Sequence, residues 1–327
     1  MLQNVNLKKI RLFYDGEEIP LEIFDVDGDS IFNNNDYFQF VGKVITPSPF
    51  AKLNIYNNSN LYWLTVNSDI DGKRYEEIDG YKNGWNNTFL HSLKTLHYER
   101  DVLYERFGYA KDLKRDFWYW GKAGGINGIQ SETFSATFPG FAEFFPDSNI
   151  VTIRANFHGL TDYSTIVPDH RAKIFLTSQS IDSVEWDGQN SYNFEKKIDT
   201  KKISVFPENN FQVVADGLIV ANSANPEQSR SDEIRINWFE FDFWRANRVN
   251  GQYFHLISTP EMFGKNRFSL ERWTADNMQI YIPQRGELIK NPYFTLNQYQ
   301  QVLFVDSANV RTDYYCTSNS NFLKIDS

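Results

Sequence analysis

The stretch that decides the fold is residues 149–188, NIVTIRANFHGLTDYSTIVPDHRAKIFLTSQSIDSVEWDG. Its first part alternates apolar and polar side chains, a period of two that places one set on a core face and the other toward solvent. The apolar set is Val151, Ile153, Ala155 and Phe157. The stretch therefore begins with a half-buried strand, which Gly159 closes.

A second alternating run follows a polar loop that contains Pro168. Its apolar positions are Ala172, Ile174 and Leu176, and Trp186 then precedes an Asp-Gly turn dipeptide. Two strands, a loop long enough to change sheets, and a large aromatic residue are typical of the middle of an antiparallel β-sandwich. The sequence therefore predicts an all-β fold with a jelly-roll-like sandwich.

Composition narrows the class of protein. The chain has 327 residues, of which 41% are hydrophobic and 17% aromatic, so it is long enough for two or three domains with sizeable cores. The abundance of aromatic residues favours strands. The net charge of -9, without a block of like charges, argues against nucleic acid and anionic membrane surfaces as partners.

Location is left open by the sequence. The N-terminal segment MLQNVNLKKI lacks the apolar core of a signal peptide, and no apolar run approaches the roughly 20 residues that span a bilayer. Cys316 is the single cysteine, which excludes an internal disulfide and a cysteine-rich metal site. A secreted fragment whose signal has been removed and a cytoplasmic protein both remain open.

Further strands are expected along the chain. Residues 7–24 predict a hairpin around Asp15-Gly16, and residues 80–92 are loop-like. The charged segment after Thr95 is interpreted as a linker, although a short helix is an alternative, and it leads into a strand at 116–120. In 234–244 the apolar parity changes, which predicts a β-bulge near Trp238–Phe239. The other expected strands are 37–44, 61–66, 134–138, 194–198, 211–214, 217–220, 268–273, 278–282 and 302–306.

Residues 25–36, DVDGDSIFNNND, have the oxygen spacing of a calcium loop. The predicted ligands are the side chains of five residues and one backbone carbonyl, at Asp25, Asp27, Asp29, Ile31 (carbonyl), Asn33 and Asp36. Two features depart from the usual loop, because Ser30 replaces the glycine at position six and Asp36 replaces a glutamate. The flanks are expected to be strands, so this is no EF-hand. The alternative is a solvated acidic turn.

Several motifs, in chain order, resemble the non-catalytic N-terminal region of gingipain-type cysteine peptidases, in particular the peptidase-like sortase component of the type IX secretion system. They are DVDGDSIFNNNDYFQFVGK, NLYWLTVNSDIDGKRY, HYERDVLY followed by DFWYW, IRANFHGLTD with PDHRAKIFL and EWDG, and IRINWFEFDFWR. In that family a caspase-like α/β catalytic domain follows this region. The resemblance implies that this chain lacks the catalytic part, which would begin after FLKIDS, and that it is no enzyme itself.

A cysteine-peptidase dyad of His158 and Cys316 is weighed and set aside. Nucleophilic catalysis needs the thiol beside the imidazole. Cys316 lies in YYCTSNS, which lacks the small-residue strand of such a nucleophile, and His158 matches the sandwich motif. A metal cluster of His158, Asp162, Asp169 and His170 is also possible, but a loop held by polar hydrogen bonds is preferred because the spacing does not suit a preformed tetrahedron. A calcium role for Asp162 and Asp169 is a weaker alternative.

The tryptophans indicate carbohydrate binding as an alternative function, because jelly-roll modules stack sugars on exposed aromatic rings. Trp63, Trp118 and Trp186 lie in strand patterns and are expected in the core. Trp85, in the loop sequence GWNNT, is the candidate sugar-binding residue.

Together these observations predict three segments. Residues 1–95 form a small β-domain with the acidic loop, 96–258 form the sandwich, and 259–327 form a short β segment that packs back near the first domain. The expected function is a scaffold or binding region that precedes a gingipain-like catalytic domain, with a possible structural Ca²⁺. The resemblance implies an extracellular, cell-surface or periplasmic location. Expected partners are the downstream catalytic domain, other secretion-system proteins or glycans, with no nucleic acid and no membrane span.

Overall fold

A computed structural model of the chain defines the fold, and two compact units can be distinguished in it. Residues 94–245 form the sandwich unit. The flanking unit consists of residues 1–45, 54–93 and 246–327, so that its sequence lies on both sides of the sandwich unit. The structure describes residues 4–33, 35–42, 60–66, 69–80, 83–105, 117–125, 132–139, 150–202, 208–216, 231–295, 300–319 and 322.

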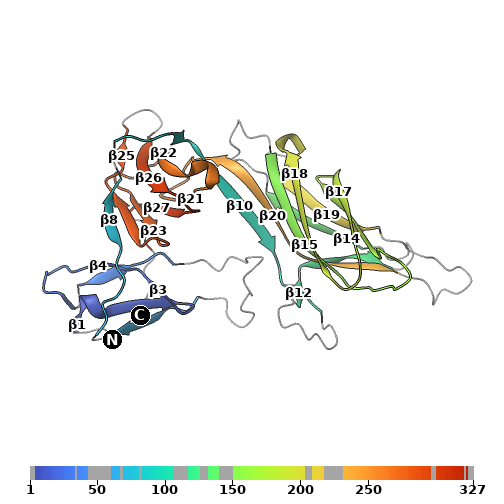
Figure 1. The fold of residues 1–327 in the computed structure, drawn as a ribbon, viewed down its shortest axis with the longest axis horizontal. Helices are drawn as coiled ribbons and strands as arrows, with labels where there is room; N and C mark the ends of the chain where they lie inside the picture. Colours follow the sequence, from blue (N-terminus) through green and yellow to red (C-terminus); the bar gives the residue numbers. More distant parts are fainter. Residues whose placement is uncertain are drawn as a thin grey trace, which may run out of the picture. The chain divides into compact units, whose positions relative to one another are not determined.

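Strands dominate both units, and the prediction of an all-β fold is confirmed (Figure 1). Within the described ranges, helical structure is limited to short 3-10 turns such as Leu7–Lys9, Thr200–Lys202 and Pro260–Met262. None of these turns has the length and hydrophobicity to span a membrane.

The sandwich unit contains two antiparallel sheets. The first has the order β10-β20-β15-β18, and β13 also pairs with β20. Its strands are β10 (His91–Glu99), β13 (Gly121–Gly125), β15 (Ile150–Gly159), β18 (Ser191–Asp199) and β20 (Asp232–Ala246). The second has the order β14-β19-β16-β17. Its strands are β14 (Thr133–Pro139), β16 (His170–Leu176), β17 (Gln179–Trp186) and β19 (Glu208–Ala215), and a separate two-stranded ribbon consists of β11 (Leu103–Tyr104) and β12 (Trp118–Tyr119).

The deciding stretch supplies a strand to each sheet. β15 belongs to the first sheet and β16 to the second, so the loop between them changes sheets as predicted. The apolar positions of both strands are buried in one core with inward residues of the other strands. This core contains Val151, Ile153, Ala155, Phe157, Ala172, Ile174, Leu176 and Trp186, with Phe134, Ala136, Phe138, Phe194, Phe211, Ile234, Ile236, Phe239, Phe241 and Phe243. The alternation in the sequence is therefore the alternation between core and outer face.

A bulge in β20 produces the predicted change of parity, one residue earlier than expected. Asn156 of β15 lies opposite Trp238, whereas Phe157 lies opposite Ile236, so Asn237 is the extra residue. Trp238 was expected to point into the core, and this is wrong. Because Phe239 is in the core, its neighbour Trp238 lies on the outer face, where it is 7% exposed and its ring is tilted against that of His97 at a centroid distance of 5.5 Å.

The segment interpreted as a loop and linker contains a nine-residue strand, β10, and that interpretation is wrong. Leu96 and Tyr98 pack against the sandwich core, while Thr95 and His97 hydrogen-bond to residues of β20 on the outer face. This alternation is present in the sequence but is hidden by the density of charge around it. Residue 116 and the predicted strand 217–220 lie outside the described residues.

The flanking unit has two larger sheets. One has the order β21-β27-β23-β24-β8 and the other β25-β26-β22-β9. The strands of the first are β8 (Glu76–Asp79), β21 (Tyr253–Ile257), β23 (Gln279–Ile282), β24 (Glu287–Lys290) and β27 (Asp313–Thr317). Those of the second are β9 (Thr88–Phe89), β22 (Gly264–Leu270), β25 (Tyr293–Phe294) and β26 (Val302–Ala308).

Small N-terminal sheets complete the flanking unit. They are β1 (Val5–Asn6) with β5 (Ile31–Phe32), β3 (Glu17–Ile19) with β2 (Ile10–Tyr14) and β7 (Trp63–Val66), and β4 (Glu22–Phe24) with β6 (Tyr37–Gln39). The predicted hairpin is confirmed, with Asp15 and Gly16 at φ 51° and 79° in its turn. Trp63 was expected in the core, and this is wrong, because β7 is an edge strand and Trp63 is 67% exposed.

The N-terminal strands are tied to the larger sheets by a buried polar contact. The Tyr281 hydroxyl of β23 donates to the Glu22 carboxylate of β4, and Lys290 of β24 lies 3.3 Å from the same carboxylate. Burial, and then the hydrogen bond to Glu22, raises the pKa of Tyr281. The hydroxyl therefore stays protonated and donates to the carboxylate at any ordinary pH.

Candidate functional site

The acidic loop, residues 25–36, lies between β4 and β6 and includes β5, and its first part curls tightly because two residues adopt a left-handed backbone. Gly28 has φ 78° and Ser30 has φ 65°. Glycine tolerates this conformation readily, whereas serine does so at some cost. Gly28, at position four of the loop, therefore takes the left-handed conformation without strain. Ser30 takes it with strain at position six, where a glycine is usual.

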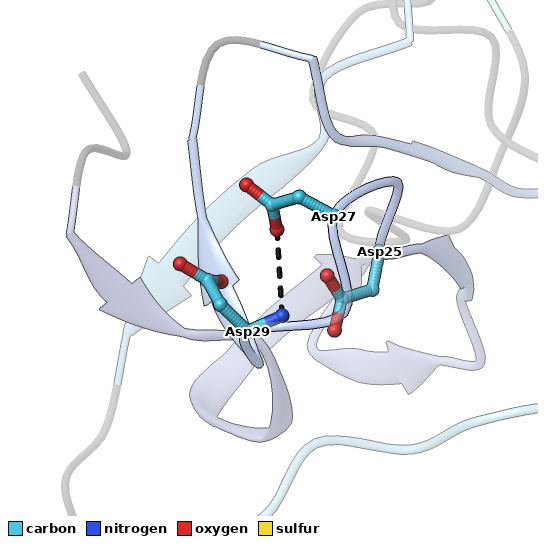
Figure 2. A group of neighbouring side chains, drawn as sticks. All are labelled: Asp25, Asp27 and Asp29. Atoms are coloured by element: carbon cyan, nitrogen blue, oxygen red, sulfur yellow. Dashed lines mark hydrogen bonds between the residues drawn. The ribbon is translucent and has the colours of Figure 1, made fainter.

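Three of the predicted ligands come together on this loop. Single oxygens of Asp25, Asp27 and Asp29 all lie within 4.8 Å of one another, and the three residues are exposed (Figure 2). Two oxygens on opposite sides of a calcium ion lie about 4.8 Å apart, since Ca–O distances are 2.3–2.6 Å. These three carboxylates are therefore the residues of the loop that could hold a hard cation.

Backbone N–H groups orient these carboxylates. Asp25 accepts from the N–H groups of Gly28 and Ser30 at 2.8 and 2.9 Å, and Asp29 accepts from Ile31 at 2.7 Å. Asp27 accepts from the Asn33 side-chain amide at 2.6 Å, and this hydrogen bond is the main cause that lowers the pKa of Asp27. Asp27 is therefore held in its charged form, as a metal ligand requires.

Asp36 has a different place in the loop. It is 8% exposed, and its two oxygens accept from the N–H groups of Val26 and Asn33 at 2.8 and 2.9 Å. It closes the loop rather than joining the cluster of three aspartates. Asn33 donates its side-chain amide to Asp27, and Ile31 lies in β5, where it pairs with Asn6 of β1.

Trp85, the candidate sugar-binding residue, lies in a loop that runs beside β22. The Arg267 guanidinium stacks over its indole ring, 4.2 Å from the centroid. Trp85 is half-buried. One side of this ring is therefore occupied by a cation–π contact.

His158 and Cys316 are each buried within a different unit. His158 is 1% exposed, and its Nδ1 lies 3.2 Å from the Ser191 hydroxyl. Cys316 is 0% exposed in β27, where it pairs with Phe254 and Ile280. Neither side chain has the accessible setting of a catalytic group.

Of the residues weighed as a metal cluster, Asp169 and His170 are buried and hydrogen-bonded, whereas Asp162 is exposed. His170 is 0% exposed; its Nδ1 donates to Asp232 at 2.6 Å and its Nε2 donates to the Thr161 carbonyl at 3.0 Å. Asp169 accepts from the N–H groups of Tyr163 and Gly188 at 2.9 and 2.8 Å. Among the described residues, the only group of acidic, histidine or cysteine side chains placed to hold a metal is the aspartate cluster.

A second charged network, which the sequence analysis missed, lies on the outer face of the first sandwich sheet. Arg154 donates to Glu240 at 2.6 Å and to Asp242, and the two ring nitrogens of His97 lie 3.2 Å from Glu240 and 3.0 Å from Glu99. Burial favours the neutral form of His97, but the hydrogen bonds to Glu240 and Glu99 outweigh it and raise the pKa of His97. Arg154 and His97 therefore neutralise carboxylates that would otherwise repel one another.

Comparison with solved structures identifies a distant likeness. A scan of protein families and a search of curated proteins find no match. The fold is similar to that in the crystal structure of dimeric latent PorU from Porphyromonas gingivalis. The TM-score is 0.59 at 11% sequence identity, and the match covers 96% of this chain and 29% of that one. At this identity the likeness shows a shared fold, and the chain spans about three-tenths of the length of PorU.

The C-terminal CBM6 of LamC from Zobellia galactanivorans is also similar, with a TM-score of 0.24 at 17% identity. That match covers 45% of this chain and 98% of the module. A likeness of this size carries no argument about fold or ligand.

Proposed function

We propose that this chain is a non-catalytic accessory region that accompanies a gingipain-like cysteine peptidase or a type IX secretion sortase. The observation that supports the proposal best is the shared fold with PorU, which extends over 96% of this chain but over only 29% of PorU. The motifs quoted from the sequence resemble the same group of proteins. The role is that of a scaffold or binding region for a catalytic domain or for other secretion proteins, at an extracellular, cell-surface or periplasmic location.

Within this role the acidic loop binds a structural calcium ion. Asp25, Asp27 and Asp29 supply the carboxylates, and the ion would offset the repulsion of three exposed like charges. The first part of the loop connects β4 to β5, which belong to two of the small N-terminal sheets. Bound calcium would therefore stabilise the N-terminal part of the flanking unit.

The chain itself has no peptidase activity under this proposal. The test combines a binding and an activity measurement. The tagged chain is used to capture proteins from its source cells, and it is assayed in parallel against peptides that contain Arg or Lys. Co-purification of a gingipain-type peptidase, with no hydrolysis by the chain alone, is expected. Hydrolysis that disappears in Cys316→Ala, or the absence of any such peptidase among captured proteins, contradicts the proposal.

A further inference from the structure

A cavity of about 260 Å³ opens on the flanking unit, and residues of both larger sheets line it. Drug-sized ligands fill roughly 300–1,000 Å³, so this cavity suits a smaller molecule of about one ring. Two of the lining side chains are aliphatic and most of the others are charged. They are Ile78, Lys265, Arg285, Glu287, Val305, Asp306 and Ser307.

The charges in the cavity balance one another. Arg285 lies 2.7 Å from the Asp306 carboxylate and 2.8 Å from the Glu287 carboxylate, and it also donates to the Ser307 carbonyl at 3.0 Å. Lys265 donates to the Asn83 carbonyl at 2.6 Å. An anion in the cavity would meet two carboxylates, and a metal cation would meet a guanidinium and an ammonium group. The lining therefore favours a neutral ligand.

A neutral ligand for this lining needs both polar and apolar surface. Carboxylates accept hydrogen bonds, guanidinium and ammonium groups donate them, and the Ser307 hydroxyl does both. Ile78 and Val305 offer aliphatic surface between these groups. A sugar ring combines hydroxyl groups around its edge with C–H groups on its faces. It matches this mixture better than an apolar molecule, which would cover polar groups without offering them any hydrogen bond.

The Trp85 loop is fixed beside the cavity by its contacts with β22. Asn86 donates its N–H to the Lys265 carbonyl at 2.8 Å, and Arg267 donates its N–H to the Asn87 carbonyl at 2.9 Å. Asn266, which is 1% exposed, accepts from the Asn87 N–H at 3.2 Å. Lys265, which lines the cavity, thus bonds the loop on both sides of Trp85. The aromatic ring is preorganised, so little conformational entropy is lost when a ligand stacks on it.

We propose that this cavity and Trp85 together bind one neutral sugar ring, such as the terminal residue of a glycan. The ring enters the cavity with its hydroxyl groups toward Glu287, Arg285 and Lys265, and Trp85 contacts the part that remains outside. This site goes beyond the accessory role and does not depend on it.

The experiment titrates the chain with glucose, galactose, mannose and N-acetylglucosamine by saturation-transfer NMR and calorimetry, with sulfate and glucuronate as charged comparisons. Ser307→Phe fills the cavity from an exposed position without removing a charge, and Trp85→Ala removes the ring. Ser183→Phe, which adds the same bulk at an exposed position of β17 outside the cavity, is the matched control for the cavity. Trp63→Ala is the control for the ring, because Trp63 is exposed on β7 and does not line the cavity.

Saturable binding of at least one neutral sugar is expected. Affinity should fall at least about tenfold in Ser307→Phe and Trp85→Ala, and stay within about twofold in the two controls. Thermal melts show that each variant is folded. The inference is overturned if no neutral sugar binds, if only sulfate or glucuronate binds, or if folded Ser307→Phe binds as well as the unaltered chain.

Discussion

His170 donates its Nδ1–H to Asp232 across a distance of 2.6 Å, between the start of β16 and the start of β20. Its other nitrogen donates to the Thr161 carbonyl, so both nitrogens carry protons and the ring is a buried imidazolium. Burial favours the neutral ring, but the hydrogen bond to Asp232 and the charges of Asp232 and Asp169 outweigh it, and the pKa of His170 is raised above 6.5. One cation therefore ties the two sheets of the sandwich to the loop that connects them.

The first prediction concerns pH. A group whose pKa is raised on folding stabilises the native state fully below its unfolded pKa, and this contribution is lost as the pH rises through the folded pKa. The free energy of unfolding should therefore fall as the pH rises above about 6.5, by the amount that His170 contributes. Urea melts from pH 5.5 to 9 measure this. In His170→Gln this part of the pH dependence should vanish.

His97 also lowers the free energy of unfolding as the pH rises, because its pKa is raised as well. The contribution of His170 is therefore the difference between the parent chain and His170→Gln at each pH. Asp232→Asn provides a second variant, since it removes the acceptor charge and leaves the imidazole. A difference that grows with rising pH would show that His170 is neutral in the native state.

Gly159 is predicted to be intolerant of any side chain. A Cβ atom at this position would lie 2.2 Å from His170 Nε2 and 2.5 Å from the Gly188 carbonyl, closer than real Cβ atoms approach. Because His170 is fixed by Asp232, Gly159→Ala should cost about 1–3 kcal/mol of stability, as overpacked cores do. Ser191→Ala, in the neighbouring strand β18, is the control substitution and should cost less stability. A melting temperature of Gly159→Ala equal to that of the parent chain would show that the loop relaxes freely.

The two faces of β15 are predicted to respond differently to alanine. Phe157 is 0% exposed in the core, so Phe157→Ala should cost about 3–5 kcal/mol through lost burial and the cavity left behind. Arg154 lies on the outer face but has carboxylate partners, so Arg154→Ala should cost about 1–2 kcal/mol rather than nothing. Lys197→Ala, at an exposed position of β18, should stay within about 0.5 kcal/mol. Denaturant melts that rank Arg154→Ala above Phe157→Ala would mean that the two faces are assigned the wrong way round.

Strands with an uninterrupted period of two could be predicted well. Val151, Ile153 and Phe157 are all in the core, and Ala172, Ile174 and Leu176 are in the core from the opposite sheet. The period of the pattern sets which face is buried, and the loop length sets the change of sheet. Sequence alone therefore sufficed for the middle of the sandwich.

The errors share one physical cause, which is that neighbouring strands and residues decide on which face a side chain lies and what covers it. Trp63 has a strand pattern, but no strand pairs with β7 on its outer side in the described part of the chain, so the ring stays exposed. Trp238 is displaced to the outer face by a single extra residue, Asn237. For the acidic loop, the sequence spacing correctly predicted that Asp25, Asp27 and Asp29 lie close together. It could not reveal that backbone N–H groups engage Asp36, because that depends on how the loop closes.

The last prediction is that calcium stabilises the flanking unit through the acidic loop. If Asp25, Asp27 and Asp29 bind the ion in the native state only, calcium at about 100 times its Kd should add about 2.7 kcal/mol to the free energy of unfolding. Thermal melts in calcium and in chelator measure the gain, and native mass spectrometry counts the ions bound. In Asp27→Asn the gain should shrink sharply, because one charged ligand of the cluster is lost. Asp276→Asn, an exposed aspartate outside the loop, should keep it. Equal melting temperatures with calcium and with chelator, and no bound ion in the parent chain, would leave the loop as an acidic turn held by its own backbone hydrogen bonds.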